Sequence, residues 1–204
     1  MRLLYLAAGF YLSCVIAFAA DAEKTIVFLG DSLTAGYGVS PEEAYPALIQ
    51  QRIRDEALPY RVVPAGISGD TSSGVLRRLD WIMQQRFDIL VLAIGGNDGL
   101  RGLPVEELEK NLIAIIEKVR ARYPDATIIL AGMKMPPNMG LPYASAFAGV
   151  YPRVAKQADV RFIPFLLEGV AGKPKLNQDD TIHPTAEGQK IIADIVWKSL
   201  KPLL

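Results

Sequence analysis

Short apolar segments alternate with segments of helical periodicity along almost the whole chain, and this alternation restricts the possible folds more than any other feature. Each apolar segment is rich in Val, Ile, Leu and Phe and has the length of a buried strand. Between these segments, apolar residues recur three and four positions apart, as on the buried face of a helix. The predicted strands are residues 25–29, 61–65, 88–94, 127–131 and 160–165, and the predicted helices include residues 45–53, 75–83, 108–119 and 191–196.

Helix-start signals support this division. Ser40-Pro41-Glu42-Glu43 has the pattern of a capping box with proline in the first turn, and Pro104 and Pro184 stand where a helix accepts proline. Strands that alternate with helices form a parallel sheet, because each parallel connection needs a crossover that packs on one face. The predicted fold class is therefore α/β, a three-layer α/β/α sandwich with a five-stranded parallel sheet. The 204 residues contain no linker or repeat, which predicts a single domain.

Composition excludes several classes of function. The 22 basic and 22 acidic residues balance, and the basic residues do not cluster, so a nucleic-acid partner is not expected. The single His and single Cys provide no ligand set for a zinc site, so we expect no metal.

The first twenty residues have the pattern of an export leader. Arg2 precedes an apolar run over residues 3–18, and Ala17-Phe18-Ala19 has the small-x-small spacing of a signal-peptidase site. We predict a signal peptide at residues 1–20, a mature domain at residues 21–204, and a periplasmic or secreted location without a stable membrane anchor. An uncleaved anchor is one alternative, and a lipoprotein attached at Cys14 is another, although Cys14 follows a poor lipobox.

Glycine-rich loops follow the first three predicted strands, and a long loop precedes the last helix. Ligands of such sheets bind beyond the carboxyl ends of the strands, so these loops should meet there. Singly, each loop has an ordinary structural explanation, such as a helix cap at Ser32 or turn chemistry at Asn97. Together they supply the hydroxyl, imidazole, carboxylate and NH donors that a serine hydrolase needs. The loops are Gly30-Asp31-Ser32-Leu33, Gly66-Ile67-Ser68-Gly69-Asp70, Gly95-Gly96-Asn97-Asp98 and Asp180-Thr181-Ile182-His183-Pro184.

These blocks resemble, in order, the four blocks of the GDSL or SGNH hydrolase family, over nearly all of residues 25–202. Residues 96–102 and 166–172 are most similar to the branch of bacterial arylesterases, thioesterases and lysophospholipases. One departure is Pro64-Ala65-Gly66, where family members commonly carry Asn. The resemblance implies a flavodoxin-like fold, the SGNH hydrolase fold. No Gly-x-Ser-x-Gly elbow is present, which argues against an α/β-hydrolase.

The resemblance also implies catalytic roles that agree with the residue types. Ser32 is the expected nucleophile and His183, the only imidazole in the chain, the general base. Asp180 is expected to orient His183. Asp179 is the alternative, and its spacing from His183 is less favourable. The expected oxyanion donors are the backbone NH groups of Ser32 and Gly69 and the side chain of Asn97.

Other residues have weaker predictions. Asp31 and Asp70 are expected to be structural, because short carboxylates beside glycine-rich turns usually cap backbone NH groups. An apolar stretch after the fourth strand either lines a groove for the acyl chain or packs the loop onto the core. Its substrate-binding candidates are Met135, Pro137, Met139, Leu141 and Tyr143, and Met133 and Pro136 belong to the same stretch.

The predicted function is that of a serine esterase acting on small acyl esters, thioesters or lysophospholipids, without a metal or organic cofactor. A carbohydrate O-deacetylase on the same fold is an alternative. A different class of function is a non-catalytic module in which residues 66–72 bind an anion at a helix start. The sequence does not specify the oligomeric state.

Overall fold

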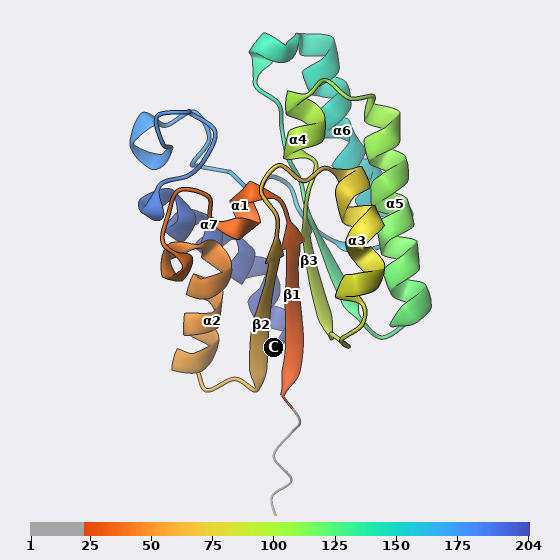
Figure 1. Cartoon of the computed structure of the whole chain (residues 1–204), viewed down its shortest axis with the longest axis vertical. Helices are drawn as coiled ribbons and strands as arrows, with labels where there is room; N and C mark the ends of the chain where they lie inside the picture. Colours follow the sequence, from red (N-terminus) through yellow and green to blue (C-terminus); the bar gives the residue numbers. More distant parts are fainter. Residues whose placement is uncertain (1–22) are drawn as a thin grey trace, which may run out of the picture.

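The computed structural model describes residues 23–204, and the predicted signal peptide lies outside this range. Its centre is a five-stranded parallel sheet with strand order β2-β1-β3-β4-β5, which confirms the predicted fold class (Figure 1). All five predicted strands are present. The last strand ends earlier than expected, since Pro164 has no NH group to continue the ladder. The strands are β1 Lys24–Gly30, β2 Tyr60–Gly66, β3 Ile89–Ala93, β4 Thr127–Ala131 and β5 Arg161–Ile163.

Helices cover both faces of the sheet and complete the three layers. Helices α2 and α7 pack together on one face, and α3, α5 and α6 pack side by side on the other (Figure 1). The α-helices are α1 Ser32–Ala35, α2 Tyr45–Asp55, α3 Ser72–Ile82, α4 Gly96–Leu100, α5 Val105–Arg122, α6 Leu141–Gln157 and α7 Ala186–Leu200. Short 3-10 helices are η1 Pro41–Glu43, η2 Pro137–Met139, η3 Pro174–Leu176 and η4 Lys201–Leu203.

The helix starts follow the predicted signals with one adjustment. The Glu43 carboxylate accepts hydrogen bonds from the Ser40 NH and hydroxyl, but this capping box caps the start of η1. Helix α2 begins two residues after Glu43, at Tyr45. Helix α5 begins directly after Pro104, and α7 begins after Pro184 and its N-cap Thr185.

Helix α6 was not predicted from the sequence. Its residues include Pro142 and Pro152 and several small side chains, which obscure the helical period. Tertiary packing supports the helix, because Phe147, Val150 and Tyr151 are fully buried against the core. The apolar stretch after β4 is therefore only partly a loop, and its last residues form the start of α6.

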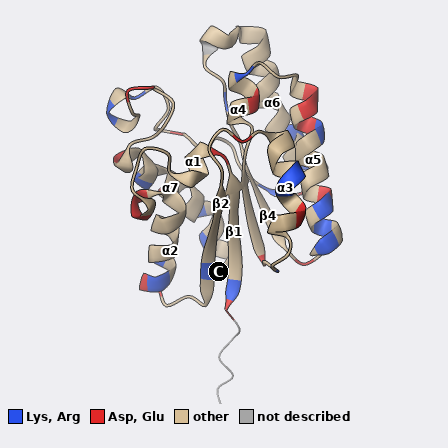
Figure 2. Cartoon of the chain, viewed as in Figure 1, with Lys and Arg blue, Asp and Glu red and all other residues tan. Residues whose placement is uncertain are grey.

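The hydrophobic core lies between the helices and both faces of the sheet. Strand β1 is buried over six of its seven residues and β3 over its whole length. Charged residues of both signs lie mainly on the helices that cover the sheet, whereas few lie in the strands (Figure 2). Among residues 23–204, no helix is both long enough and apolar enough to cross a membrane.

The strand register places the ends of β1, β2 and β3 side by side, so the loops that follow these strands begin at the same edge of the sheet. Gly30, the last residue of β1, is paired with Gly66 at the end of β2 and with Ala93 at the end of β3. A Cβ atom at Gly30 would clash with Thr34 and with the Ala93 carbonyl, so α1 can fold tightly over the strand ends only because position 30 is glycine. The first three glycine-rich loops consequently start beside one another.

Candidate active site

Ser32 and His183 meet at the carboxyl edge of the sheet. Ser32 is the first residue of α1, directly beyond β1, and it is 9% exposed. The His183 side chain, 19% exposed, comes from the long loop before α7. The Ser32 Oγ lies 2.9 Å from His183 Nε2, although 151 positions separate the two residues in the sequence. This distance is within hydrogen-bonding range, as proton transfer from a serine to a histidine requires.

Asp180 contacts the opposite side of the imidazole. Its Oδ2 lies 2.6 Å from His183 Nδ1, and its Oδ1 accepts hydrogen bonds from the backbone NH groups of Ile182 and His183. Thr181, with φ of 62°, makes the tight turn that folds the carboxylate back onto the ring. Asp179 is exposed and has no side-chain hydrogen bond within residues 23–204. The geometry therefore favours Asp180 over Asp179 as the partner of His183.

Hydrogen bonds keep the Asp180 carboxylate ionised. Desolvation raises its pKa, but the backbone NH and ring of His183, followed by the NH of Ile182, outweigh this and lower the pKa from 3.8 to about 2. Because the pKa is lower in the folded state, the resulting stabilisation is complete above about pH 4 and is lost as the pH falls towards 2.

The predicted oxyanion donors lie on the three loops at this edge. The backbone NH groups of Ser32 and Gly69 donate to no protein acceptor within residues 23–204. Gly69 has φ of 80°, a conformation that favours glycine. The Asn97 amide donates one hydrogen bond, of 2.9 Å, to the Asp70 carbonyl, so its second hydrogen remains for another acceptor. These groups are available to bind a negatively charged oxygen.

Arg78 supports the loop that carries Gly69. Its Nε forms a 2.8 Å ion pair with Asp70, and its Nη2 donates to the carbonyls of Gly30 and Ala65, near the ends of β1 and β2. Asp70 also accepts a hydrogen bond from the Thr71 NH, the structural role expected for it. The pairing with Arg78 was not predicted, because no local pattern connects the two residues.

Asp31 and Asp98 are buried carboxylates that cap helices. Asp31 accepts a hydrogen bond from the Leu33 NH at the start of α1, and Asp98 accepts from the Ser72 NH at the start of α3. Burial raises the pKa of Asp31 from 3.8 to about 6, although the Leu33 hydrogen bond and the nearby His183 act against it. Asp31 is thus structural, as expected, and costs stability when it ionises.

We expect Asp31→Asn to change the pH dependence of stability. A pKa raised on folding means that the stability of the wild type falls as the pH rises from about 4 to about 6, by about 3 kcal/mol. Asn can keep the Leu33 hydrogen bond without the buried charge. Chemical unfolding at pH 4 and pH 8 should show the variant gaining stability relative to the wild type by about that amount at pH 8. An equal difference at both pH values would contradict the burial effect.

The candidate groove residues are distributed between core and surface. Met133 and Met135 are buried, and Met135 packs so closely on Gly99 that a Cβ atom there would clash with its sulfur. Met135 therefore packs the loop onto the core, which was the other role that the sequence allowed.

The remaining candidates lie around the start of α6. Met139 is half-buried, Leu141 is 69% exposed, and the Tyr143 hydroxyl donates to the Leu103 carbonyl. The Pro137 side chain lies outside the described part of the structure. A groove for the acyl chain remains a prediction, carried by Met139, Leu141 and Tyr143.

Tyr37 and Gln178 lie near His183, and the sequence did not predict either as part of the site. The Tyr37 ring lies 4.5 Å from the His183 ring, centroid to centroid, at an angle of 42°. Gln178 makes hydrogen bonds to the segments on both sides of the site. No motif or spacing in a single sequence distinguishes these residues from ordinary loop residues.

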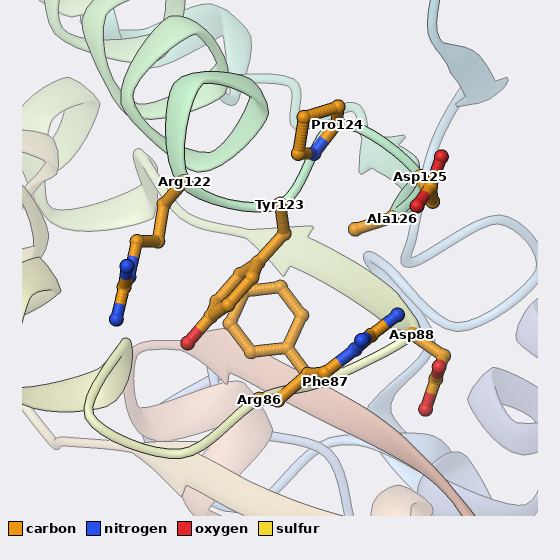
Figure 3. Close-up of a pocket in the computed structure, with 8 residues that line it drawn as sticks. All are labelled: Arg86, Phe87, Asp88, Arg122, Tyr123, Pro124, Asp125 and Ala126. Carbon is orange, nitrogen blue, oxygen red and sulfur yellow. The ribbon is translucent and has the colours of Figure 1, made fainter.

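A pocket lies at the opposite edge of the sheet. It is lined by residues 86–88, which lead into β3, and by residues 122–126, which lead into β4 (Figure 3). Since these segments precede the strands, the pocket is separated from Ser32 by the length of the sheet. Within residues 23–204, no group of three His, Cys, Asp or Glu side chains is arranged to hold a metal ion.

Comparison with known proteins agrees with the resemblance in the sequence. Residues 28–191 match the model of the GDSL-like lipase/acylhydrolase family. The chain is 41% identical to the esterase TesA of Pseudomonas aeruginosa, over 95% of this chain and 96% of that protein. It is also 41% identical to the thioesterase 1/protease 1/lysophospholipase L1 of Escherichia coli K12, over 93% of this chain and 89% of that protein.

Comparison with solved structures shows the same relationship to TesA. A crystal structure of TesA superposes with a TM-score of 0.85 at 42% identity, covering 89% of this chain and all of the other. The strand order, the converging loops and these matches together establish that the chain belongs to the GDSL-like lipase/acylhydrolase family and is a carboxylic ester hydrolase with the SGNH hydrolase fold.

Proposed function

We propose that this esterase cleaves acyl esters through a Ser32-His183-Asp180 triad and an acyl-enzyme intermediate. The observation that carries the proposal is the continuous chain of contacts from Ser32 Oγ through both ring nitrogens of His183 to Asp180 Oδ2. A carboxylate at Nδ1 keeps the proton on that nitrogen and leaves Nε2 free to accept the serine proton.

A specific chemical group of the protein can be assigned to each step of ester hydrolysis. Ser32 Oγ attacks the substrate carbonyl carbon while His183 Nε2 takes the hydroxyl proton. The resulting oxyanion accepts hydrogen bonds from the NH groups of Ser32 and Gly69 and from Asn97. Collapse of the tetrahedral intermediate breaks the ester bond, and the leaving alcohol or thiol takes the proton from His183. Water activated by His183 then releases the carboxylic acid and restores Ser32.

The surface around the site supports apolar acyl substrates. Most of the exposed large hydrophobic side chains of the described residues lie on the carboxyl side of the sheet, and Trp81 on α3 is the exception. Tyr37 contacts the His183 ring and Ile182 directly precedes His183, and apolar side chains exposed next to a catalytic centre favour a substrate with a hydrocarbon part. Esters, thioesters and lysophospholipids share this chemistry and correspond to the names of the relatives. The side chains are Tyr37, Ile67, Leu100, Leu141 and Ile182.

A panel of p-nitrophenyl esters of increasing chain length, with one acyl thioester and one lysophospholipid, tests this function. We expect hydrolysis that extends beyond acetate, and labelling of Ser32 by a fluorophosphonate. Turnover of acetate alone would indicate the deacetylase alternative. Absence of turnover and of labelling would indicate a non-catalytic module.

We expect Met139→Ser combined with Leu141→Ser to shift the preference towards shorter acyl chains. The two substitutions remove apolar surface beside the predicted path of the chain, and each buried methylene contributes about 0.8 kcal/mol. The kcat/KM values across the ester panel measure the effect. Trp81→Ser, which removes an exposed apolar side chain from α3, serves as the control and should leave the profile unchanged. An unchanged profile in the double variant would reject the groove.

We also propose that the enzyme is exported to the periplasm or secreted. Residues 1–20 have the leader pattern, and the only Cys, Cys14, lies within it. The mature enzyme would then contain no thiol. Mass spectrometry of the exported protein should show an amino terminus near residue 20, and an intact Met1 would contradict cleavage.

A further inference from the structure

Gln178 holds the loop that carries His183 from several sides. Its Nε2 donates hydrogen bonds of 2.7 Å to the Tyr37 carbonyl and 3.0 Å to the Pro184 carbonyl. Both hydrogens of the carboxamide are therefore used. The backbone NH of Gln178 donates to the His183 carbonyl, and its own carbonyl accepts from the Thr181 NH. Gln178 is thus connected to residues on both sides of the catalytic imidazole and to the imidazole residue itself.

The same carboxamide reaches the segment that follows Ser32. The Tyr37 NH donates a 3.0 Å hydrogen bond to the Ser32 carbonyl, and the Tyr37 ring lies beside the His183 ring. A Cβ atom at Gly38 would clash with the Gln178 carboxamide, so this close approach depends on glycine. Tyr37 consequently connects the backbone of Ser32 to the Gln178 side chain.

This connection matters because the hydrogen bonds between His183 and Asp180 do not locate the imidazole relative to Ser32. Asp180 belongs to the same loop as His183 and moves with it. Between residues 177–184 and residues 31–40 of the described chain, the Gln178–Tyr37 bond is the only hydrogen bond besides that of His183 with Ser32. The loop is long, and catalysis depends on the separation of hydroxyl and imidazole, since a 1 Å misplacement can lower the rate about 100-fold.

We infer that Gln178 is a positioning residue that sets the separation of Ser32 and His183 by linking their two segments through the Tyr37 and Pro184 carbonyls. The inference rests on the proposed function of this pair. A glutamate in its place would direct one carboxylate oxygen, where Nε2 now lies, at both carbonyl oxygens, so the link would be replaced by repulsion. An alanine would remove the link without repulsion.

Gln178→Glu and Gln178→Ala test this role, with Gln85→Glu as a matched control. Gln85 is exposed and makes no side-chain hydrogen bond within residues 23–204, so its substitution changes the charge equally without a link to break. For the Gln178 variants we expect kcat to fall about 10- to 100-fold. KM should change less than about threefold, and fluorophosphonate labelling of Ser32 should slow in parallel with kcat. The control should match the wild type in all three quantities.

Each rate is divided by the concentration of folded protein, which circular dichroism and thermal unfolding determine. Should Gln178→Glu not fold, Gln178→Met provides an uncharged side chain of similar length. A folded Gln178 variant with near wild-type kcat and labelling rate would overturn the inference, even if its Tm were lower, because that result describes a merely structural residue. Absence of Ser32 labelling in the wild type would instead overturn the proposed function, and the inference with it.

Discussion

Ser32→Ala and His183→Ala are each expected to lower kcat by about 10⁴-fold or more, the size of effect seen when a serine hydrolase loses its nucleophile or base. Ser32→Ala removes the attacking oxygen. His183→Ala removes the proton acceptor 2.9 Å from it, and no other histidine in the chain can replace it. Initial rates with p-nitrophenyl esters measure both losses.

The two substitutions should also be strongly non-additive. Because the nucleophile and base act as one unit, the double variant should be little slower than either single variant. Ser199→Ala, on α7 and remote from the candidate site, is the control and should retain the wild-type rate. Retention of near wild-type activity by either single variant would mean that the roles assigned to Ser32 and His183 are wrong.

Asp180→Asn is expected to lower kcat by about 10³- to 10⁴-fold with little change in fold. An asparagine can keep its oxygen on the NH groups of Ile182 and His183, which places its NH₂ group against His183 Nδ1. The imidazole would then carry its proton on Nε2, where it cannot accept a proton from Ser32. The variant should therefore remain folded while losing activity, as far-ultraviolet circular dichroism and initial rates can show.

Asp179→Asn is the matched control for this prediction. It removes the same charge one residue away, from a side chain that makes no hydrogen bond in the described part of the chain. Its kcat should stay within about twofold of the wild type, as expected for an exposed charge. A large loss in Asp179→Asn with none in Asp180→Asn would reverse the assignment of the orienting carboxylate.

The fold and the main contacts of the site could be predicted because they have local or compositional signals. Buried strands of a parallel sheet are continuous apolar runs, so β1 to β5 were recognisable, and the carboxyl-edge rule then indicated which loops meet. His183 was predictable as the base because the chain contains only one histidine. Asp180 was favoured by its spacing, which the turn at Thr181 accounts for.

Other features depended on interactions that have no local pattern. Helix α6 has Gly149 and Pro152 in its interior, which lower its helix propensity, and packing of Phe147 and Tyr151 stabilises it. Met135 was a groove candidate in the sequence, but its position against Gly99 shows that it packs into the core. An apolar side chain fits either environment, so only its neighbours decide between them.

The sequence by itself determined the five strands, the helices α2, α3, α5 and α7, the edge at which the loops meet, and the residue types available for ester cleavage. Only the tertiary structure decided how those residues are held: Arg78 across the ends of β1 and β2, and Gln178 between the Tyr37 and Pro184 carbonyls. The physical reason is that these side chains bind backbone carbonyls of distant segments. Every residue has a backbone carbonyl, so no residue type identifies the residue whose carbonyl is bound. The contact forms only once the chain has folded.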